Sequence, residues 1–63
     1  MNIQEIVRYA VSVSEDHRDE YGEINLTQLE ENVIAHFDLA CGQFEDNDIS
    51  FLIFKELERL KLL

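Results

Sequence analysis

The sequence contains no proline, no tryptophan, one cysteine and two glycines among its 63 residues. A single cysteine, Cys41, excludes an internal disulfide, and we expect it to be a small buried hydrophobic residue. A chain of this length has little core to stabilise it. Regular helix packing or self-association is therefore expected to supply the stability that disulfides supply in other small domains.

Long hydrophobic runs are also absent. No stretch of about twenty apolar residues occurs, so no membrane-spanning helix is expected. The first residues include the acidic Glu5 and no small-residue cleavage pattern, which argues against a signal peptide. These absences favour a cytoplasmic protein, and with 46% hydrophobic residues the chain is too apolar to be an acidic disordered tail.

Basic residues are scarce, with five Lys and Arg against fourteen Asp and Glu and a net charge of −9. Between residues 15 and 48 the only basic residue is Arg18. This charge repels a phosphate backbone, so direct binding of DNA or RNA is disfavoured, and it attracts a basic surface. Solubility alone is the other explanation for the excess charge, and the sequence leaves both open.

Residues 25–42 have the clearest helical pattern, and we expect the rest of the chain to pack against them. Asn25 is the predicted N-cap, with Gln28 three residues later, and Ile24 and Leu29 flank it as a hydrophobic staple. Gly42 is the predicted stop. The apolar stripe of this helix consists of Leu26, Leu29, Val33, Phe37 and Ala40.

A first helix is predicted over residues 3–17, with Asn2 as its N-cap and Glu5 at the third helical position. Its apolar face consists of Ile3, Ile6, Val7, Ala10 and Val13. A strand over residues 9–13 is the weaker alternative, because no glycine or proline interrupts the helical period.

The connection between these helices is acidic. Negative side chains near a helix C-terminus oppose the helix dipole, so we expect the first helix to fray there. Glu15 and Arg18 have the spacing of an ion pair, and Gly22 is the predicted turn. We expect Tyr21 to fold back onto the core.

After a polar loop over residues 43–48, in which Asn47 or Asp48 is the predicted cap, a third helix is expected over residues 49–62. Its stripe consists of Ile49, Leu52, Ile53, Leu57 and Leu60. Phe51, Phe54, Leu62 and Leu63 lie off this stripe. An apolar arc this wide is covered either by several neighbours or by an intermolecular contact. A strand over residues 49–54 would have no second strand to pair with.

Metal and catalytic sites are not expected. A calcium loop starting at Asp46 would have Phe51 where glycine is required and Leu57 where glutamate is required. His36 and Cys41 point about 140° apart on a regular helix and cannot share an ion unaided. No nucleophile motif or phosphate-binding glycine loop is present, so we expect neither an enzyme nor a cofactor. A DNA-reading helix would need exposed polar or basic residues where the third helix has phenylalanine and leucine.

Residues 1–7 (MNIQEIV), the acidic residues 15–20 (EDHRDE) and the chain length together resemble the short open-reading-frame products of the exo–xis region of lambdoid bacteriophages. This resemblance covers the whole chain but contains no chemical motif. It implies a small helical early protein, made in the cytoplasm of the infected bacterium from a region associated with the choice between lysis and lysogeny and with host physiology. It supplies no catalytic residues.

These patterns predict one all-α domain over residues 1–63, with three helices joined by short connections. The predicted core consists of Ile6, Val7, Ala10, Leu29, Val33, Phe37, Leu52, Ile53 and Leu57. We expect a non-enzymatic protein that binds a bacterial host or phage protein.

The predicted contact has an apolar anchor, formed by Phe51, Phe54 and Leu62, and an acidic rim in residues 15–23 and 45–48. The rim residues singled out are Asp16, Asp19, Glu20, Glu45 and Asp46. Aromatic anchors would supply most of the affinity, and the charge would mainly raise the association rate. The alternatives are an acidic imitation of nucleic acid that inhibits a DNA-binding protein, and a homodimer formed through the third helix.

Overall fold

The computed structural model describes residues 2–63, except for the side chain of Cys41, so the predicted burial of that side chain lies outside the described residues. Its helices are α1 (Ile3–Val13), the 3₁₀ helix η1 (Ser14–His17), α2 (Leu26–Phe37), α3 (Cys41–Asp46) and α4 (Ile49–Arg59). Residues 2–63 form no β-strand, and an isolated bridge pairs Arg18 with Ile24. The predicted all-α fold is confirmed, although the described chain has four α-helices where three were expected.

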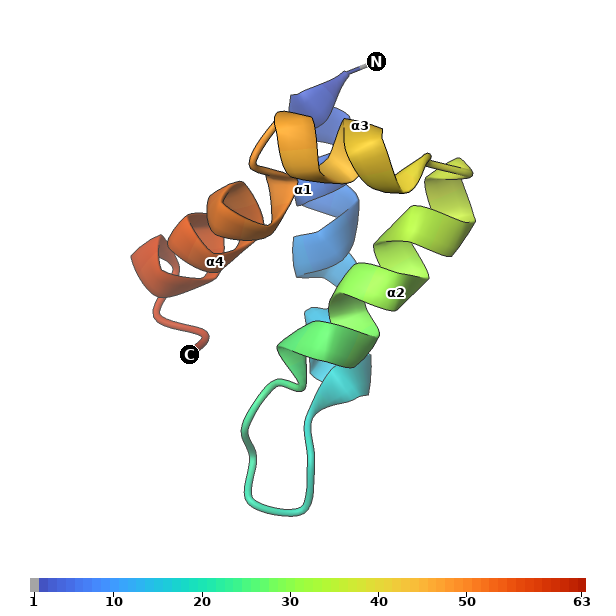
Figure 1. Cartoon of the computed structure of the whole chain (residues 1–63). Helices are drawn as coiled ribbons and strands as arrows, with labels where there is room; N and C mark the ends of the chain where they lie inside the picture. The colour runs from blue at the N-terminus through green and yellow to red at the C-terminus, as the bar shows by residue number, and fades with distance from the viewer. Residues whose placement is uncertain (1) are drawn as a thin grey trace.

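Helix α1 is the central element. It contacts α2 and α4, which lie on either side of it, while α3 packs on α4 and crosses one end of the molecule (Figure 1). The prediction that the chain packs around the helix beginning at Leu26 is therefore wrong. The reason lies in α1, where the fully buried Ile6 and the small Ala10 provide a surface that two helices approach.

Both predicted asparagine N-caps are confirmed. The side-chain oxygen of Asn2 accepts a hydrogen bond from the backbone N–H of Glu5, and that of Asn25 accepts one from Gln28, each at 3.2 Å. Both asparagines have extended backbone conformations, as N-cap residues do. Caps of this kind contribute about 1 kcal/mol each to stability.

Helix α2 ends at Phe37, so the prediction that it continues to Gly42 is wrong. Asp38 has φ 52°, in the left-handed region. Its N–H donates to the carbonyl oxygen of Ala35, and the N–H of Leu39 donates to that of Ile34 at 3.0 Å. This is the Schellman pattern, which aspartate tolerates because its short polar side chain permits the left-handed conformation.

The predicted polar loop over residues 43–48 is wrong, because most of it belongs to helix α3. Phe44 is 7% exposed and holds this short helix on the core. The side chain of Asn47 donates to the carbonyl oxygen of Gln43 at 2.8 Å rather than capping α4. Asp48 lies at the N-cap position of α4 with φ 50° and makes no side-chain cap hydrogen bond, so the predicted cap is wrong.

The chain leaves η1 at His17 and forms a turn that projects beyond the helices (Figure 1). The N–H of Asn25 donates to the carbonyl oxygen of His17 at 2.8 Å and closes this turn. Gly22 has φ 80°, which confirms the predicted turn residue. Tyr21 is 82% exposed, so the prediction that it folds back is wrong.

The buried core combines all four α-helices with Ile24 from the turn. It consists of Ile6, Ala10, Ile24, Leu29, Val33, Phe44, Ile49, Ile53 and Leu57. Six of the predicted core residues are therefore confirmed (Ile6, Ala10, Leu29, Val33, Ile53 and Leu57). Val7 and Phe37 pack partly buried against this core, whereas Leu52 is exposed because the buried face of α4 follows Ile49, Ile53 and Leu57.

Candidate partner-binding groove

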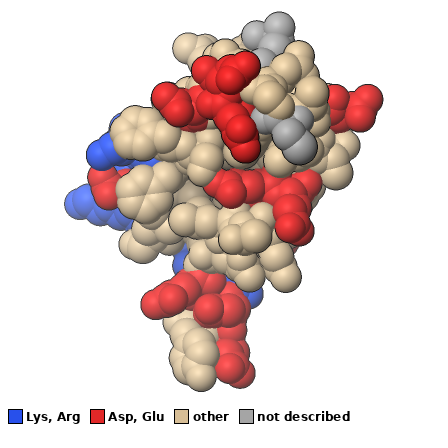
Figure 2. All heavy atoms as spheres, viewed as in Figure 1, with Lys and Arg blue, Asp and Glu red and all other residues tan. Residues whose placement is uncertain are grey.

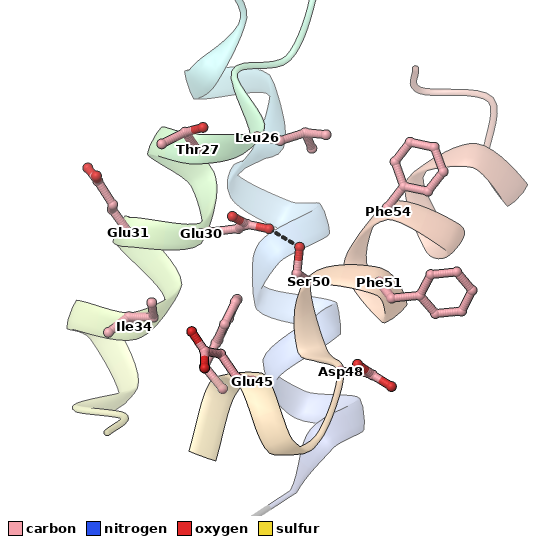
Figure 3. Close-up of a pocket in the computed structure, with 11 residues that line it drawn as sticks. Leu26, Thr27, Glu30, Glu31, Ile34, Glu45, Asp48, Ser50, Phe51 and Phe54 are labelled. Carbon is pink, nitrogen blue, oxygen red and sulfur yellow. Dashed lines mark hydrogen bonds between the residues drawn. The ribbon is translucent and has the colours of Figure 1, made fainter. Parts of the chain in front are cut away.

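A groove with a volume of 750 Å³ lies between helices α2, α3 and α4 (Figure 3). Its apolar lining consists of Leu26, Ile34, Phe44, Phe51 and Phe54. Its acidic lining consists of Glu30, Glu31, Glu45 and Asp48. Thr27 and Ser50 complete the described lining, so the groove combines a hydrophobic surface with carboxylates from three parts of the chain.

The phenylalanines of α4 lie at the edge of this groove. Phe51 is 56% exposed and Phe54 is 37% exposed. Figure 3 shows both rings projecting from the same side of α4, away from α2. The prediction that they lie off the buried stripe is therefore confirmed, and the groove has an aromatic edge that the core does not cover.

The groove carboxylates form no ion pair with the described residues. Ion pairs in residues 2–63 join Glu15 with Arg18, Glu58 with Lys55, and Glu56 with Arg59. None of these pairs includes a carboxylate of the groove, and no lysine or arginine appears in its described lining. The hydroxyl of Ser50 donates a hydrogen bond to the carboxylate of Glu30, which joins α4 to α2 across the groove (Figure 3).

Charge is distributed unevenly over the surface seen in Figure 2. Acidic side chains gather over α2, α3 and the projecting turn, while basic side chains gather along the edge formed by α4. Lys55, Arg59 and Lys61 come from α4 and the residues that follow it. On this face most of the basic side chains therefore lie to one side of the acidic ones.

A second hollow, of 340 Å³, lies between the turn and the C-terminal residues. Phe54 lines both this hollow and the groove, while Leu62 lines the hollow alone and is half-buried. The structure thus brings together the three predicted anchor residues Phe51, Phe54 and Leu62, with Phe54 as the common member. We call these three residues the apolar strip.

Arg18 forms the polar side of the second hollow. Its guanidinium pairs with Glu15 at 2.7 Å, which confirms the predicted ion pair, and donates hydrogen bonds to the carbonyl oxygens of Gly22 and Leu62. The hydrogen bond from Arg18 lowers the pKa of Glu15, and the same bond raises the pKa of Arg18. The hydrogen bond between Glu56 and Arg59 shifts their pKa values in the same directions.

The structure divides the predicted acidic rim into two parts. Glu45 lines the groove, whereas Asp46, Asp16, Asp19 and Glu20 do not line it. The carboxylate of Asp19 instead orders the turn, because it accepts hydrogen bonds from the backbone N–H groups of residues 21 and 23 at 2.8 and 3.0 Å. The aspartate therefore has a structural role that its charge alone did not indicate.

The groove also contains residues that the sequence did not identify as part of a site. The sequence shows that Glu30 and Glu31 lie off the apolar stripe of α2. Their place in the same groove as Phe51 depends on how α2 and α4 pack, and no sequence pattern fixes that packing. Only the tertiary structure identifies them as groove residues.

The two histidines have structural contacts. His36 is exposed, and its ring stacks on that of Tyr9 with 3.9 Å between ring centroids. The ring nitrogen Nε2 of His17 lies 3.0 Å from the amide nitrogen of Asn32, whose oxygen accepts a hydrogen bond from the Tyr9 hydroxyl at 2.9 Å. The described residues contain no cluster of three or more potential metal ligands. Among them, no helix has both the length and the apolar character needed to cross a bilayer.

Comparison with protein-family models, with curated proteins and with solved structures gave no match. The resemblance to exo–xis products therefore stays a prediction from the sequence. What the groove can bind has to be argued from its own geometry and charge.

Proposed function

We propose that the chain is a non-enzymatic interaction protein that binds another protein through the groove and the apolar strip. The observation that carries this proposal is the exposure of Phe51 and Phe54, 56% and 37%, beside carboxylates that have no ion-pair partner in residues 2–63. Aromatic side chains at the centre of an interface supply much of its binding energy. A surrounding ring of charge mainly raises the association rate and selects the partner.

The chemistry of the groove supports binding rather than catalysis. Its described lining contains carboxylates, two hydroxyl groups and apolar side chains, without histidine, lysine or arginine. Activation of a hydroxyl nucleophile requires a base that is itself oriented by a third group. Ser50 donates to Glu30 from an exposed position, and no third group orients the pair in the described lining.

The finer proposal concerns the biological setting. The resemblance of residues 1–7 and 15–20 to exo–xis products supports a bacteriophage early accessory protein that acts in the cytoplasm of the infected bacterium. Its partner would be a host or phage protein, and binding would modulate phage development or host physiology.

Affinity capture from infected cells tests the proposal. The immobilised chain is compared with a Phe51→Ser, Phe54→Ser double variant and with Tyr21→Ser, which removes an exposed aromatic ring outside the groove. We expect the wild type and Tyr21→Ser to retain the same protein and the double variant to lose it about tenfold or more. Circular dichroism of each variant verifies folding. Retention that is unaffected by the double substitution, or no retained protein at all, would contradict the proposal.

A second candidate function is imitation of nucleic acid, so that the chain blocks a DNA-binding protein. The acidic surface over α2, α3 and the turn favours it (Figure 2). Affinity for the captured protein, measured against ionic strength, separates the two functions. A nucleic-acid mimic loses affinity steeply as salt rises, whereas binding through the phenylalanines changes little.

A homodimer formed through α4 is the remaining alternative, in which a second copy of the chain would cover the apolar strip. The net charge of −9 opposes it, because two copies repel each other. Sedimentation velocity over a dilution series measures this directly. We expect a monomer at every concentration, and a dimer that the Phe51→Ser, Phe54→Ser variant abolishes would assign the strip to self-association.

A further inference from the structure

We infer that the segment which occupies the groove is a basic amphipathic α-helix of the partner protein. This inference rests on the proposed function and specifies the chemistry of the ligand. Three features of the groove carry it: the secondary structure of its walls, the presence of apolar and acidic side chains together in its lining, and the absence of lysine and arginine from that described lining.

The walls of the groove are helical on every described side. Residues from α2 form one wall, residues from α4 form the other, and α3 closes one end (Figure 3). Backbone groups in these walls are hydrogen-bonded within their own helices, so no strand edge is available to pair with an extended peptide. The backbone hydrogen bonds of a ligand must then be made within the ligand itself. A helix meets this requirement when it inserts its apolar face into a groove.

The apolar surface of the groove has the form that one helix face requires. Phe44 is buried at its base, Leu26 and Ile34 are half-buried on α2, and the two phenylalanines stand exposed on α4. The volume of 750 Å³ lies within the range of about 300–1,000 Å³ typical of ligand clefts. This space admits a row of side chains from one helix face, at intervals of three and four residues, and not a folded domain.

The acidic lining determines the charge of the ligand. Glu30 and Glu31 lie on the α2 wall, while Glu45 and Asp48 lie at the end formed by α3 and the start of α4 (Figure 3). Elsewhere on the described chain Glu15, Glu56 and Glu58 have arginine or lysine partners. The four groove carboxylates lack them, so lysine or arginine on the flanks of the ligand helix would complete these pairs. The same carboxylates repel nucleic acid.

Binding of synthetic helical peptides to the folded full chain tests this inference. The first peptide has about sixteen residues, long enough for substantial helicity, with leucines on one face and lysine and arginine on its flanks. The second has glutamate at the flanking positions. The third has the composition of the first in an order that distributes the leucines around the helix. Fluorescence anisotropy should give an affinity for the first peptide at least about tenfold above that for either of the others.

Two charge-reversal variants locate the binding surface. Glu31→Lys with Glu45→Lys changes the groove, while Asp16→Lys with Glu20→Lys makes the same change in net charge outside it. The groove pair should weaken binding of the first peptide about tenfold or more, and the outer pair by about threefold or less. Amide shifts on peptide addition should be largest for residues that line the groove.

Three results would overturn the inference: no binding of the first peptide at about 1 mM, equal binding of the rearranged peptide, or equal weakening by both charge-reversal pairs. The capture experiment and the peptide experiment can fail independently of each other. If a protein is captured in a phenylalanine-dependent way but the basic peptide does not bind, the proposed function stands and the ligand is not a basic helix. If the peptide binds the groove but infected cells yield no phenylalanine-dependent partner, the ligand class stands and the proposed function fails.

Discussion

The guanidinium of Arg18 donates a hydrogen bond to the backbone carbonyl oxygen of Leu62 at 3.0 Å, across 44 residues of chain. The N–H of Leu62 donates in turn to the carbonyl oxygen of Leu57 at 2.9 Å, next to Lys61 with φ 58°. This is the second Schellman closure in the described chain. One side chain therefore joins the projecting turn to the end of α4 and positions Leu62 beside Phe54.

Replacing Arg18 with methionine should release the C-terminal residues. The aliphatic side chain keeps its bulk but loses the hydrogen bonds to Glu15, Gly22 and Leu62. We expect faster hydrogen exchange at the amides of residues 62 and 63, with unchanged protection in the middle of α1 and α2. Arg8→Met is the matched control, because Arg8 is an exposed arginine of α1. Equal exchange at residue 62 in both variants would mean that Arg18 does not hold the terminus.

The pKa of Glu15 should depend on the same arginine. The hydrogen bond from Arg18 holds this pKa below its usual range, so an NMR titration should find it lowered in the wild type and restored in Arg18→Met. Because the folded-state pKa is the lower one, the pair stabilises the fold above the unfolded-state pKa of glutamate. That contribution disappears as the pH falls through the folded-state pKa. The difference in stability between the two proteins, measured by urea unfolding, should therefore shrink as the pH falls. The part that remains in acid comes from the bonds of Arg18 to the carbonyl oxygens of Gly22 and Leu62, and a difference that does not change with pH would contradict a contribution from the pair.

Two leucines of the C-terminal segment should differ sharply in their effect on stability. Leu57 is fully buried and Leu60 is 41% exposed. Leu57→Ala should lower the free energy of unfolding by about 2–5 kcal/mol, and Leu60→Ala by about 0.5 kcal/mol or less. A domain of this size has only about 3–5 kcal/mol available, so Leu57→Ala should be largely unfolded. Urea titration followed by circular dichroism measures both, and similar losses would mean that the buried face of α4 is assigned incorrectly.

Two phenylalanines, one in α3 and one at the edge of the groove, should also differ in their effect on stability. Phe44→Ala should lower the free energy of unfolding by about 3–5 kcal/mol and remove hydrogen-exchange protection from α3. Phe51→Ala should change stability by about 0.5 kcal/mol or less, because its ring is mostly exposed. If Phe51→Ala proves as destabilising as Phe44→Ala, the aromatic edge belongs to the core and cannot be a binding surface.

The C-terminus of α2 should tolerate glycine at position 38. Asp38→Gly relieves a left-handed conformation and removes a negative charge from the negative end of the helix dipole, so we expect a gain of about 0.5 kcal/mol. Asp38→Asn separates the effect of charge from that of backbone conformation. Gly22→Ala makes the opposite change at φ 80° and should destabilise the fold. Urea midpoints measure all three, and a loss of stability in Asp38→Gly would contradict this account.

The sequence predicted local features that depend on residues close to one another. Both asparagine caps, the ion pair of Glu15 with Arg18 and the turn at Gly22 require only neighbouring residues and were correct. The predicted end of α2 was wrong because Asp38 and Gly42 can both adopt the left-handed conformation that ends a helix. Which of the two residues ends α2 depends on the packing of Leu39. Helix α3 was missed because its polar composition resembles a loop, and the burial of Phe44 that holds it on the core depends on tertiary packing.

For the candidate site too, the sequence predicted the local features but not those that depend on tertiary packing. Exposure of Phe51 and Phe54 followed from the helical period of α4, which is a local property. The acidic residues that line the groove with them come from α2, from α3 and from the connection after α3, and bringing them together depends on tertiary packing. Composition therefore indicated an acidic surface but did not determine which carboxylates line the groove.

The separation of charge on one face of the molecule affects how an encounter begins. On the face seen in Figure 2, carboxylates lie over α2, α3 and the turn and basic side chains lie along α4, so this face carries an electric dipole in addition to the net charge of the chain. The field of an approaching cationic molecule exerts a torque on this dipole before the surfaces touch. The chain is thereby rotated so that its acidic side leads, and fewer collisions are lost to wrong orientations.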